Sequence, residues 1–286
     1  MILKVPEVTS GLYIVATPIG TAADMSIRAL ETISKVDVIL AEDTRNFRKI
    51  CEIFDIKQGS RTLLSYNDAN GIRMRAKILS FLKSAKSVAL VSDAGTPLIA
   101  DPGYKLVAEA IKEGISVTSV PGPSAFLNAL IVSGLPTDRF SFFGFVPSKD
   151  SMRLKFFSEI RDNEETLIFY DVAKRLKKTL LALEKVFSSS RQIAVCRELT
   201  KKFEEVSRGT ISKIVSDFSN IRGLKGEFVI VVRGAEKCIP SEAEIDVELK
   251  SLKGKLNFKE SVDFVTNKMR ANRRVVYSRA LKLKGD

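Results

Sequence analysis

The sequence predicts an α/β protein with two α/β lobes and a small C-terminal helical module. Over the first 120 residues, apolar runs alternate with helical patterns, which is typical of strands and helices that build a largely parallel sheet. The segment Pro121-Gly122-Pro123 then interrupts the chain, and a second set of strands and helices follows. Beyond Pro240 the pattern is helical only. We therefore expect an N-terminal lobe over residues 1–121, a second lobe over 122–236 and a basic helical module over 241–286.

The elements of the first lobe follow from short apolar runs separated by helical spacing of apolar residues. Strands are expected at residues 12–16, 36–41, 88–91 and 115–120, and helices at 27–33, 47–54, 72–82 and 104–112. The last helix has a glycine, Gly114, at its C-terminal end. Asp101 followed by Pro102 is typical of an N-cap and a first-turn proline, so we expect that helix to begin there.

The same criteria define the rest of the chain. Helices are expected at residues 124–132, 152–160, 174–187 and 211–218, and strands at 140–143, 166–170, 192–196 and 228–232. The C-terminal module should contain three helices, at residues 242–252, 258–269 and 273–281. The turn between Pro121 and Pro123 could hinge the two lobes around a cleft.

The loop at residues 92–103 is the most informative stretch of the chain. It follows the expected strand at 88–91 and places Asp93 beside Gly95 and Pro97. Ligands of open α/β sheets bind at the carboxyl ends of the strands, so this loop is a candidate ligand site. It lacks the Lys-Ser/Thr of a P-loop, and the chain has no G-x-G-x-x-G fingerprint. An ordinary strand–turn–helix connection is the alternative interpretation.

The composition excludes several kinds of catalysis. The chain has no histidine, which removes Ser-His-Asp and Cys-His nucleophiles, the H-E-x-x-H zinc site and any imidazole base. Chemistry must then use carboxylates, lysine, arginine or tyrosine, or the positioning of a reactive cofactor. Cys51, Cys196 and Cys238 form no C-x-x-C pair, so we expect free thiols and no metal site.

Charge and hydropathy indicate the compartment and the kind of partner. No apolar stretch approaches the roughly 18 to 20 residues of a membrane helix, and the N-terminus lacks a signal-peptide apolar region. We therefore expect a soluble, cytoplasmic protein without a membrane partner. The net charge of +12 favours an anionic partner, with nucleic acid as the first hypothesis. Residues 250–286 alone carry a net charge of +8, although a solvated basic tail is the alternative.

Eight motifs in a fixed order give a family resemblance. They are LYIVATPIG (12–20), AEDTR (41–45), SDAGTPLIADPG (92–103), VPGPSA (120–125), FFGFVP (142–147), IFY (168–170), CRELTK (196–201) and GEF (226–228). Together they resemble the ribosomal RNA small subunit methyltransferase I family, a branch of the tetrapyrrole methylase superfamily. The resemblance covers essentially the whole chain, including the basic module.

The resemblance implies a fold, a cofactor and a reaction. The fold is two α/β lobes of tetrapyrrole-methylase type with S-adenosylmethionine in the cleft between them. The reaction is 2′-O-methylation of a cytidine ribose in the decoding region of 16S rRNA, either free or within the 30S subunit, by a homodimer. One alternative is a methyltransferase acting on a precorrin- or uroporphyrinogen-type tetrapyrrole, which would not need a basic module. The other is a non-catalytic RNA-binding protein, against which the intact Asp93 and Ser124 argue.

The resemblance also assigns residues to cofactor binding. Pro18, at the end of the first strand, and the residues of the 92–103 loop lie in the first lobe. Ser124 and Ala125 match the superfamily's Pro-Gly-x-Ser segment. The remaining residues would close the pocket from the second lobe. The ten residues are Pro18, Asp93, Ala94, Ile99, Ser124, Ala125, Tyr170, Arg197, Gly226 and Glu227.

The catalytic candidates follow from the chemistry of methyl transfer. The protein must hold the ribose oxygen at a near-attack distance of roughly 3 to 3.5 Å from the methyl group. It must also accept the hydroxyl proton, and without an imidazole the base would be a carboxylate or a lysine. Glu42 and Lys201 lie in matching motifs, and Arg45 could hold a phosphate or stabilise an oxyanion. Salt bridges between the lobes are the alternative role for these residues.

The sequence departs from the family pattern at two places. Thr21 stands where the family usually has asparagine after Pro-Ile-Gly. Residues 171–174 are Asp-Val-Ala-Lys, where the family usually has Glu, a small residue, Pro and His.

Overall fold

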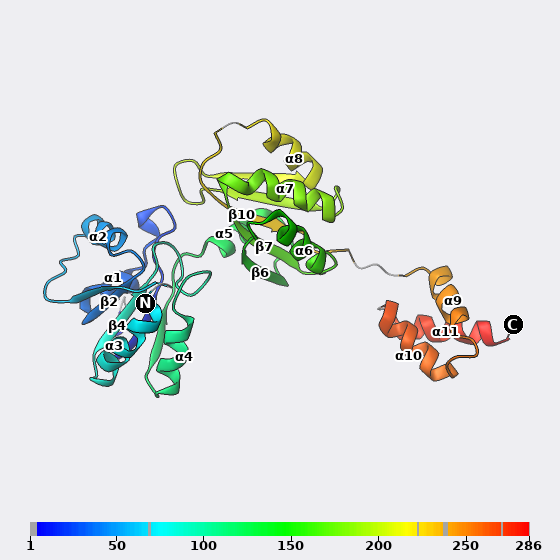
Figure 1. The fold of residues 1–286 in the computed structure, drawn as a ribbon, viewed down its shortest axis with the longest axis horizontal. Helices are drawn as coiled ribbons and strands as arrows, with labels where there is room; N and C mark the ends of the chain where they lie inside the picture. The colour runs from blue at the N-terminus through cyan, green and yellow to red at the C-terminus, as the bar shows by residue number, and fades with distance from the viewer. Residues whose placement is uncertain (1–4, 68–69, 222, 237–239, 270, 286) are drawn as a thin grey trace. The chain divides into compact units, whose positions relative to one another are not determined.

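The computed structural model describes residues 5–67, 70–221, 223–236, 240–269 and 271–285. The chain forms two compact units, residues 1–235 and 236–286 (Figure 1). The first unit contains two five-stranded sheets with helices, and the second unit is helical. This arrangement confirms the predicted fold class. The finer division of the first unit near residue 121 stays a prediction.

The first sheet is fully parallel, with strand order β3-β2-β4-β1-β5. Its elements are β1 (Gly11–Val15), α1 (Ile27–Lys35), β2 (Val38–Ala41), α2 (Thr44–Ile53), β3 (Thr62–Ser65), α3 (Gly71–Lys83), β4 (Ser87–Val91), α4 (Tyr104–Lys112) and β5 (Val117–Val120). Every residue of β4 is buried, since helices cover both faces of the sheet. Alternate residues of β4 enter different cores: Ala89 packs in one and Leu90 in the other. The parallel sheet therefore opens its carboxyl edge, rather than a face, to ligands.

The second sheet is mixed, with strand order β6-β7-β10-β8-β9. Its elements are α5 (Ala125–Ser133), β6 (Phe140–Phe145), α6 (Asp150–Ile160), β7 (Thr166–Val172), α7 (Ala173–Val186), β8 (Gln192–Arg197), β9 (Glu205–Thr210), α8 (Ile211–Ser219) and β10 (Glu227–Val232). Only the β6–β7 pair is parallel among these strands. Helices α6, α7 and α8 pack on one face, and α5 packs on the other with Ala129 and Leu130.

Three details differ from the sequence expectations. The sequence does not predict the edge strands β3 and β9, because neither is an uninterrupted apolar run. The expected start of the 104–112 helix at Asp101 is wrong, since α4 begins at Tyr104 with Gly103 at the N-cap position. Gly103 has φ +134°, and a Cβ there would lie 2.7 Å from the Leu90 side chain. The chain therefore needs glycine at this position before a helix can form, and Asp101 stays in the loop.

The second unit is a three-helix module, as predicted. It contains α9 (Glu242–Ser251), α10 (Phe258–Met269) and α11 (Arg273–Gly285), preceded by a short connection. Ser241 and Glu244 form a capping box that starts α9. The module has its own small core, centred on Ile245, Val262 and Val276.

A last feature concerns the length and polarity of the helices. In the ranges that the structure describes, none combines the length and the apolar character that crossing a membrane would require.

Candidate active site

A cavity of about 380 Å³ lies in the first unit where loops of both sheets meet. From the first sheet, Glu42 follows β2 and the loop that starts at Asp93 follows β4. From the second sheet, Tyr170 lies on β7 and Lys201 lies beyond β8. The cavity falls in the size range of small-molecule sites. Its lining residues are Ile19, Glu42, Asp93, Ala94, Gly95, Thr96, Ile99, Ala100, Asp101, Ser124, Ala125, Phe145, Tyr170, Val172, Cys196, Leu199, Lys201, Glu227 and Val229.

Most of the residues singled out from the sequence lie in this one cavity. They come from motifs separated by up to 185 positions along the chain. Those in the lining are Glu42, Asp93, Ala94, Ile99, Ser124, Ala125, Tyr170, Lys201 and Glu227. Four others, Pro18, Arg45, Arg197 and Gly226, are not part of the lining.

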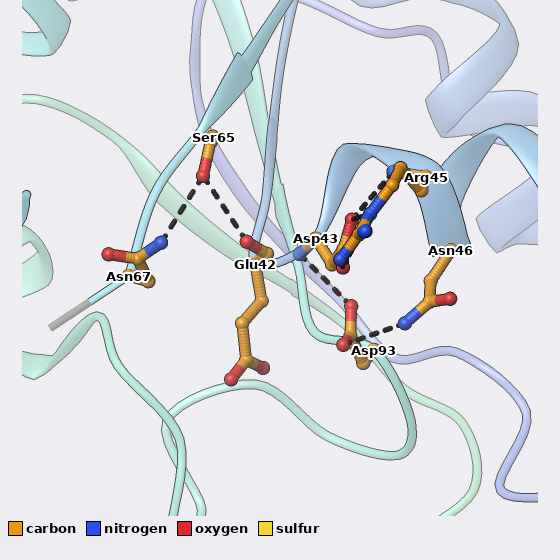
Figure 2. Close-up of polar contacts among 7 residues, drawn as sticks. All are labelled: Glu42, Asp43, Arg45, Asn46, Ser65, Asn67 and Asp93. Carbon is orange, nitrogen blue, oxygen red and sulfur yellow. Dashed lines mark hydrogen bonds and ion pairs between the residues drawn. The ribbon is translucent and has the colours of Figure 1, made fainter. Parts of the chain in front are cut away.

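Asp93 links the loop after β4 to the start of α2 (Figure 2). Its carboxylate accepts a hydrogen bond from the backbone N–H of Asp43 at 3.1 Å and another from Asn46 Nδ2 at 2.9 Å. Both donors lie in the first turn of the helix or at its N-cap, where unpaired N–H groups favour a negative charge. Asp93 therefore fixes the relative positions of two loops that both line or border the cavity.

Arg45 lies in the first turn of α2 and is not part of the cavity lining. Its guanidinium binds the Asp43 carboxylate, with Nη2 at 2.6 Å from Oδ2, and its side chain is 81% exposed. The hydrogen bond from the Arg45 side chain lowers the pKa of Asp43 to about 2. Arg45 thus completes the N-terminal cap of α2 and lies outside the cavity lining.

Glu42 directly follows β2, and its side chain points in a different direction from those of Asp43 and Arg45 (Figure 2). Figure 2 shows its carboxylate projecting away from Asp43 and Arg45, and the side chain lines the cavity. The backbone carbonyl of Glu42 accepts a hydrogen bond from Ser65 Oγ at 3.3 Å, and Ser65 lies at the end of β3. The unpredicted edge strand therefore helps to hold the end of β2 in place.

The loop after β4 is tied to its surroundings through backbone groups. Thr17 and Gly95 exchange backbone hydrogen bonds of 2.9 and 3.1 Å, and Thr17 Oγ1 donates to the Ser92 carbonyl. Thr96 Oγ1 donates to the Pro123 carbonyl at 3.0 Å. Gly95 has φ +82°, a conformation that favours glycine. Pro18 follows Thr17, which holds the loop, and is not part of the cavity lining.

Lys201 is held by two carboxylates on the second-sheet side. Its Nζ lies 3.0 Å from Glu198 Oε1 and 2.9 Å from Glu227 Oε2. Burial alone would lower the pKa of Lys201, but the hydrogen bonds and charges of Glu227 and Glu198 outweigh it and raise the pKa. Lys201 is consequently an ammonium at neutral pH, which suits a positive partner for an anion and not a general base.

Gly226 and Arg197 shape this side without reaching the cavity. A Cβ at Gly226 would lie 2.7 Å from Glu198 Cγ, so the glycine leaves room for the carboxylate that binds Lys201. Arg197 Nε donates to the Lys225 carbonyl at 3.0 Å, and its guanidinium lies 3.7 Å from Glu205. The ion pairs of Lys201 and Arg197 therefore join residues of the second sheet and its loops, at the ends of β8, β9 and β10.

The two departures from the family pattern have different surroundings. The backbone N–H of Thr21 donates to Thr200 Oγ1 at 3.1 Å, and the Thr21 hydroxyl donates to the Thr200 carbonyl. This contact joins the loop after β1 to the loop after β8. Asp171, by contrast, is buried and binds Arg175 at 2.6 Å. Strand alternation places it on the face opposite Tyr170 and Val172, which line the cavity.

The structure adds lining residues that the sequence does not single out. Asp101 is expected at a helix N-cap, and its position in the 92–103 loop is the one signal that it could belong to the site. Thr96 belongs to the same loop, and Leu199 belongs to the 196–201 motif. Phe145 has no signal beyond its place in the 142–147 motif.

The cysteines and the acidic groups fit no metal site in the described part of the chain. Within those ranges, no group of three His, Cys, Asp or Glu residues is placed to hold a metal ion. Cys51 and Cys196 are free thiols, and burial raises the pKa of Cys196 to about 12. Cys238 lies outside the described residues.

Comparison with solved structures gives the fold. The chain superposes on uroporphyrin-III-C-methyltransferase from Thermus thermophilus with a TM-score of 0.54 and 17% identity, covering 78% of this chain and 94% of that one. It superposes on diphthine synthase with a TM-score of 0.58 and 16% identity, covering 78% and 89%. At these identities the likeness shows the architecture alone.

Comparison of sequences gives the family. Residues 11–215 match the family model of tetrapyrrole (corrin/porphyrin) methylases. Ribosomal RNA small subunit methyltransferase I from Mesorhizobium japonicum is 40% identical over 273 residues, which is 96% of this chain and 92% of that protein. The protein of the same name from Synechocystis sp. is 39% identical over 279 residues, covering 96% and 99%. The chain therefore belongs to the tetrapyrrole methylase family and, by similarity along nearly its whole length, to the ribosomal RNA small subunit methyltransferases I.

Proposed function

We propose that this protein transfers a methyl group from S-adenosylmethionine to the 2′-oxygen of a cytidine ribose in 16S rRNA. One observation carries the proposal: residues from distant motifs line a single cavity at the carboxyl edge of the first sheet. Ligands of open α/β sheets bind at such an edge. The names of the relatives support a small-subunit rRNA as the substrate.

The lining fits the chemistry of the proposed cofactor. S-Adenosylmethionine carries an ammonium, a carboxylate, a sulfonium and an adenosine. Carboxylates of the lining, such as Asp93 and Asp101, suit its positive groups, while Lys201 suits its carboxylate. Ile99, Leu199 and Val229 supply apolar surface. When bound, the cofactor supplies a methyl group on an activated leaving group, so the protein needs chiefly to position the acceptor.

Glu42 is our candidate for the residue that accepts the 2′-hydroxyl proton. Lys201 is kept protonated by its two carboxylate partners, and Arg45 lies outside the lining. Asp93 already accepts two hydrogen bonds at the start of α2. Of the three catalytic candidates, Glu42 is the carboxylate, and it lines the cavity, which suits it for acid–base work.

The second unit supplies a surface for RNA phosphates. Three of its basic residues are in ion pairs: Lys268 with Glu248, Arg273 with Asp263, and Arg279 with Glu242 and Asp246. Six others are exposed and form no ion pair with a described residue: Lys250, Lys253, Lys255, Lys259, Arg274 and Lys282. When such lysines and arginines bind phosphates, they displace counterions that are condensed on the RNA, and this release favours binding. The six residues therefore favour an RNA substrate over a tetrapyrrole.

The decisive experiment is a map of 2′-O-methyl groups in 16S rRNA. Free 16S rRNA and 30S particles from cells lacking the protein are incubated with it and S-adenosylmethionine. We expect one new 2′-O-methylcytidine in the decoding region. A methyl group on a base, or on a tetrapyrrole offered in parallel, would contradict the proposal. RNA binding without transfer would favour the non-catalytic alternative.

The same experiment addresses the finer expectations. Comparing free rRNA with 30S particles shows which of them is the substrate. The homodimer and the cytoplasmic location stay predictions.

A further inference from the structure

We infer that Phe145 is the stacking surface for the nucleobase of the target nucleotide at the mouth of the cavity. The inference rests on the proposed function and adds a contact for the RNA base to those already assigned to the cofactor and to the RNA phosphates. Phe145 is 53% exposed although it is a large apolar side chain, and it still lines the cavity. Such an aromatic side chain contributes little to the core.

A break in strand register directs Phe145 to the cavity. In β6, Phe142 pairs with Ile168 of β7, but the next pair is Phe145 with Tyr170. Three steps along β6 therefore match two steps along β7, which defines a bulge. Gly144 provides the conformation that the bulge requires, with φ +67°.

Without the bulge, Phe145 would face the core. Side chains two positions apart share a face of a regular strand, so Phe145 would follow Phe143. The Phe143 ring packs on Phe156 and Phe169, on the face covered by α6, α7 and α8. The bulge transfers Phe145 to the other face, where its ring meets Tyr170 at a centroid distance of 5.4 Å. The fold thus places an aromatic ring beside the cavity at the expense of an ordinary core position.

The geometry matches what a nucleotide substrate needs. The two rings are inclined by 64°, so Tyr170 braces Phe145 in an edge contact while much of Phe145 stays open. A ribose that enters the cavity must bring its base out of the RNA stack, and an aromatic side chain replaces the missing stacking. Burial raises the pKa of Tyr170 to about 12, so the bracing residue stays neutral.

The alternative is that the adenine of the cofactor, and not the RNA base, stacks on the Phe145 ring. A pair of variants distinguishes these two ligands. Phe145→Leu removes the aromatic face, and Phe145→Trp keeps one. Phe140→Leu is the matched control, because Phe140 lies on the same strand, is 38% exposed and is not part of the cavity lining. The full-length protein is used throughout.

Three measurements are made on each variant: S-adenosylmethionine affinity by calorimetry, KM for RNA, and the fluorescence of RNA carrying a fluorescent cytosine analogue at the methylated position. We expect Phe145→Leu to raise the KM for RNA about tenfold, which is the usual effect of losing one stacking contact between a base and an aromatic side chain. It should leave cofactor affinity unchanged and abolish the fluorescence quenching that we expect with the wild-type protein. Phe145→Trp should restore quenching.

Several results would overturn the inference. A loss of cofactor affinity in Phe145→Leu would assign the ring to adenine. An equal effect of Phe140→Leu, or no effect of Phe145→Leu in a protein that methylates RNA, would show that Phe145 has no special contact. If the wild-type protein itself fails to methylate the ribose, the proposed function fails first and the inference fails with it.

Discussion

The two units of this protein hold their charged side chains in different ways. In the first unit, the charged residues at the candidate site have partners: Lys201 binds two carboxylates, and Asp93 accepts two hydrogen bonds. In the second unit, exposed cations without a described partner outnumber those in ion pairs. Partnered groups are pre-positioned and lose little entropy when a ligand binds, whereas unpaired surface lysines contribute long-range, salt-sensitive attraction.

The difference implies a division of labour. The first unit should determine cofactor binding and chemistry, and the second unit should determine much of the affinity for RNA. Apart from the base contact inferred for Phe145, substitutions in one unit should then leave the property of the other unit unchanged, which makes the comparison testable.

The largest effect is expected for Asp93→Ala. The substitution leaves the Asp43 N–H and the Asn46 amide without their acceptor and releases the loop after β4 from α2. A displacement of about 1 Å can cost about a hundredfold in rate, so activity should fall at least that far and cofactor binding should be nearly abolished. Calorimetric titration with S-adenosylmethionine measures the binding, and RNA affinity should not change.

Asp138→Ala serves as the control, since Asp138 is exposed and is not part of the lining. Unchanged cofactor affinity in a folded Asp93→Ala protein would show that the Asp93 link to α2 is dispensable.

A smaller but still large effect is expected at Lys201. Lys201→Met removes the cation and leaves Glu198 and Glu227 facing each other, which should lower kcat by about a hundredfold. Lys201→Arg keeps the charge and should retain most of the activity. Because the pKa of Lys201 is raised above its ordinary value of 10.5, its charge persists through neutral pH and disappears only as the pH rises beyond that value. If Lys201→Arg were as inactive as Lys201→Met, a role as proton acceptor would regain support.

The two sheets show how much of the fold can be predicted from the sequence. Strands β1, β2 and β4 are predictable because they are buried on both faces and form apolar runs. Strands β3 and β9 are not, because their residues are mixed in polarity, whereas the other two edge strands, β5 and β6, contain enough apolar residues to be predicted. Apolar runs therefore predict the centre of a sheet better than its edge.

The candidate site shows the same limit at the level of single residues. Motifs at strand ends predict Asp93 and Tyr170, because the carboxyl edge of a parallel sheet and its facing loops follow from topology. Phe145 cannot be predicted in this way, since a bulge reverses which face it occupies and leaves no mark on the apolar pattern. The expected helix start at Asp101 is wrong because the close approach of Gly103 to Leu90 is a tertiary contact.

The basic module should affect RNA binding in proportion to its unpaired cations. Replacing Lys250, Lys253, Lys255 and Lys259 by Gln should flatten the log–log salt dependence of RNA binding by roughly 0.7 to 0.9 for each phosphate that is no longer neutralised. Deletion of residues 241–286 should reduce the slope further. Cofactor affinity should hardly change, because all lining residues lie before position 230.

Lys268→Gln is the matched control for these substitutions. Its ammonium lies 2.7 Å from Glu248, so it already has a counterion within the module. We expect a smaller change in slope than for Lys253→Gln. If the truncated and full-length proteins gave identical slopes of RNA affinity against salt concentration, the phosphate contacts would have to lie in the first unit.

The smallest effect is the stabilisation of the first unit by its cofactor. A ligand that binds only the folded state adds about 2.7 kcal/mol to the free energy of unfolding at a hundredfold excess over its dissociation constant. Thermal unfolding with and without S-adenosylmethionine or S-adenosylhomocysteine measures this stabilisation. The shift should persist in the protein truncated at residue 240 and disappear in Asp93→Ala, because the cavity lies wholly in the first unit. A shift that required the basic module would break the division of labour between the units, since the module would then contribute to cofactor binding as well as to RNA affinity.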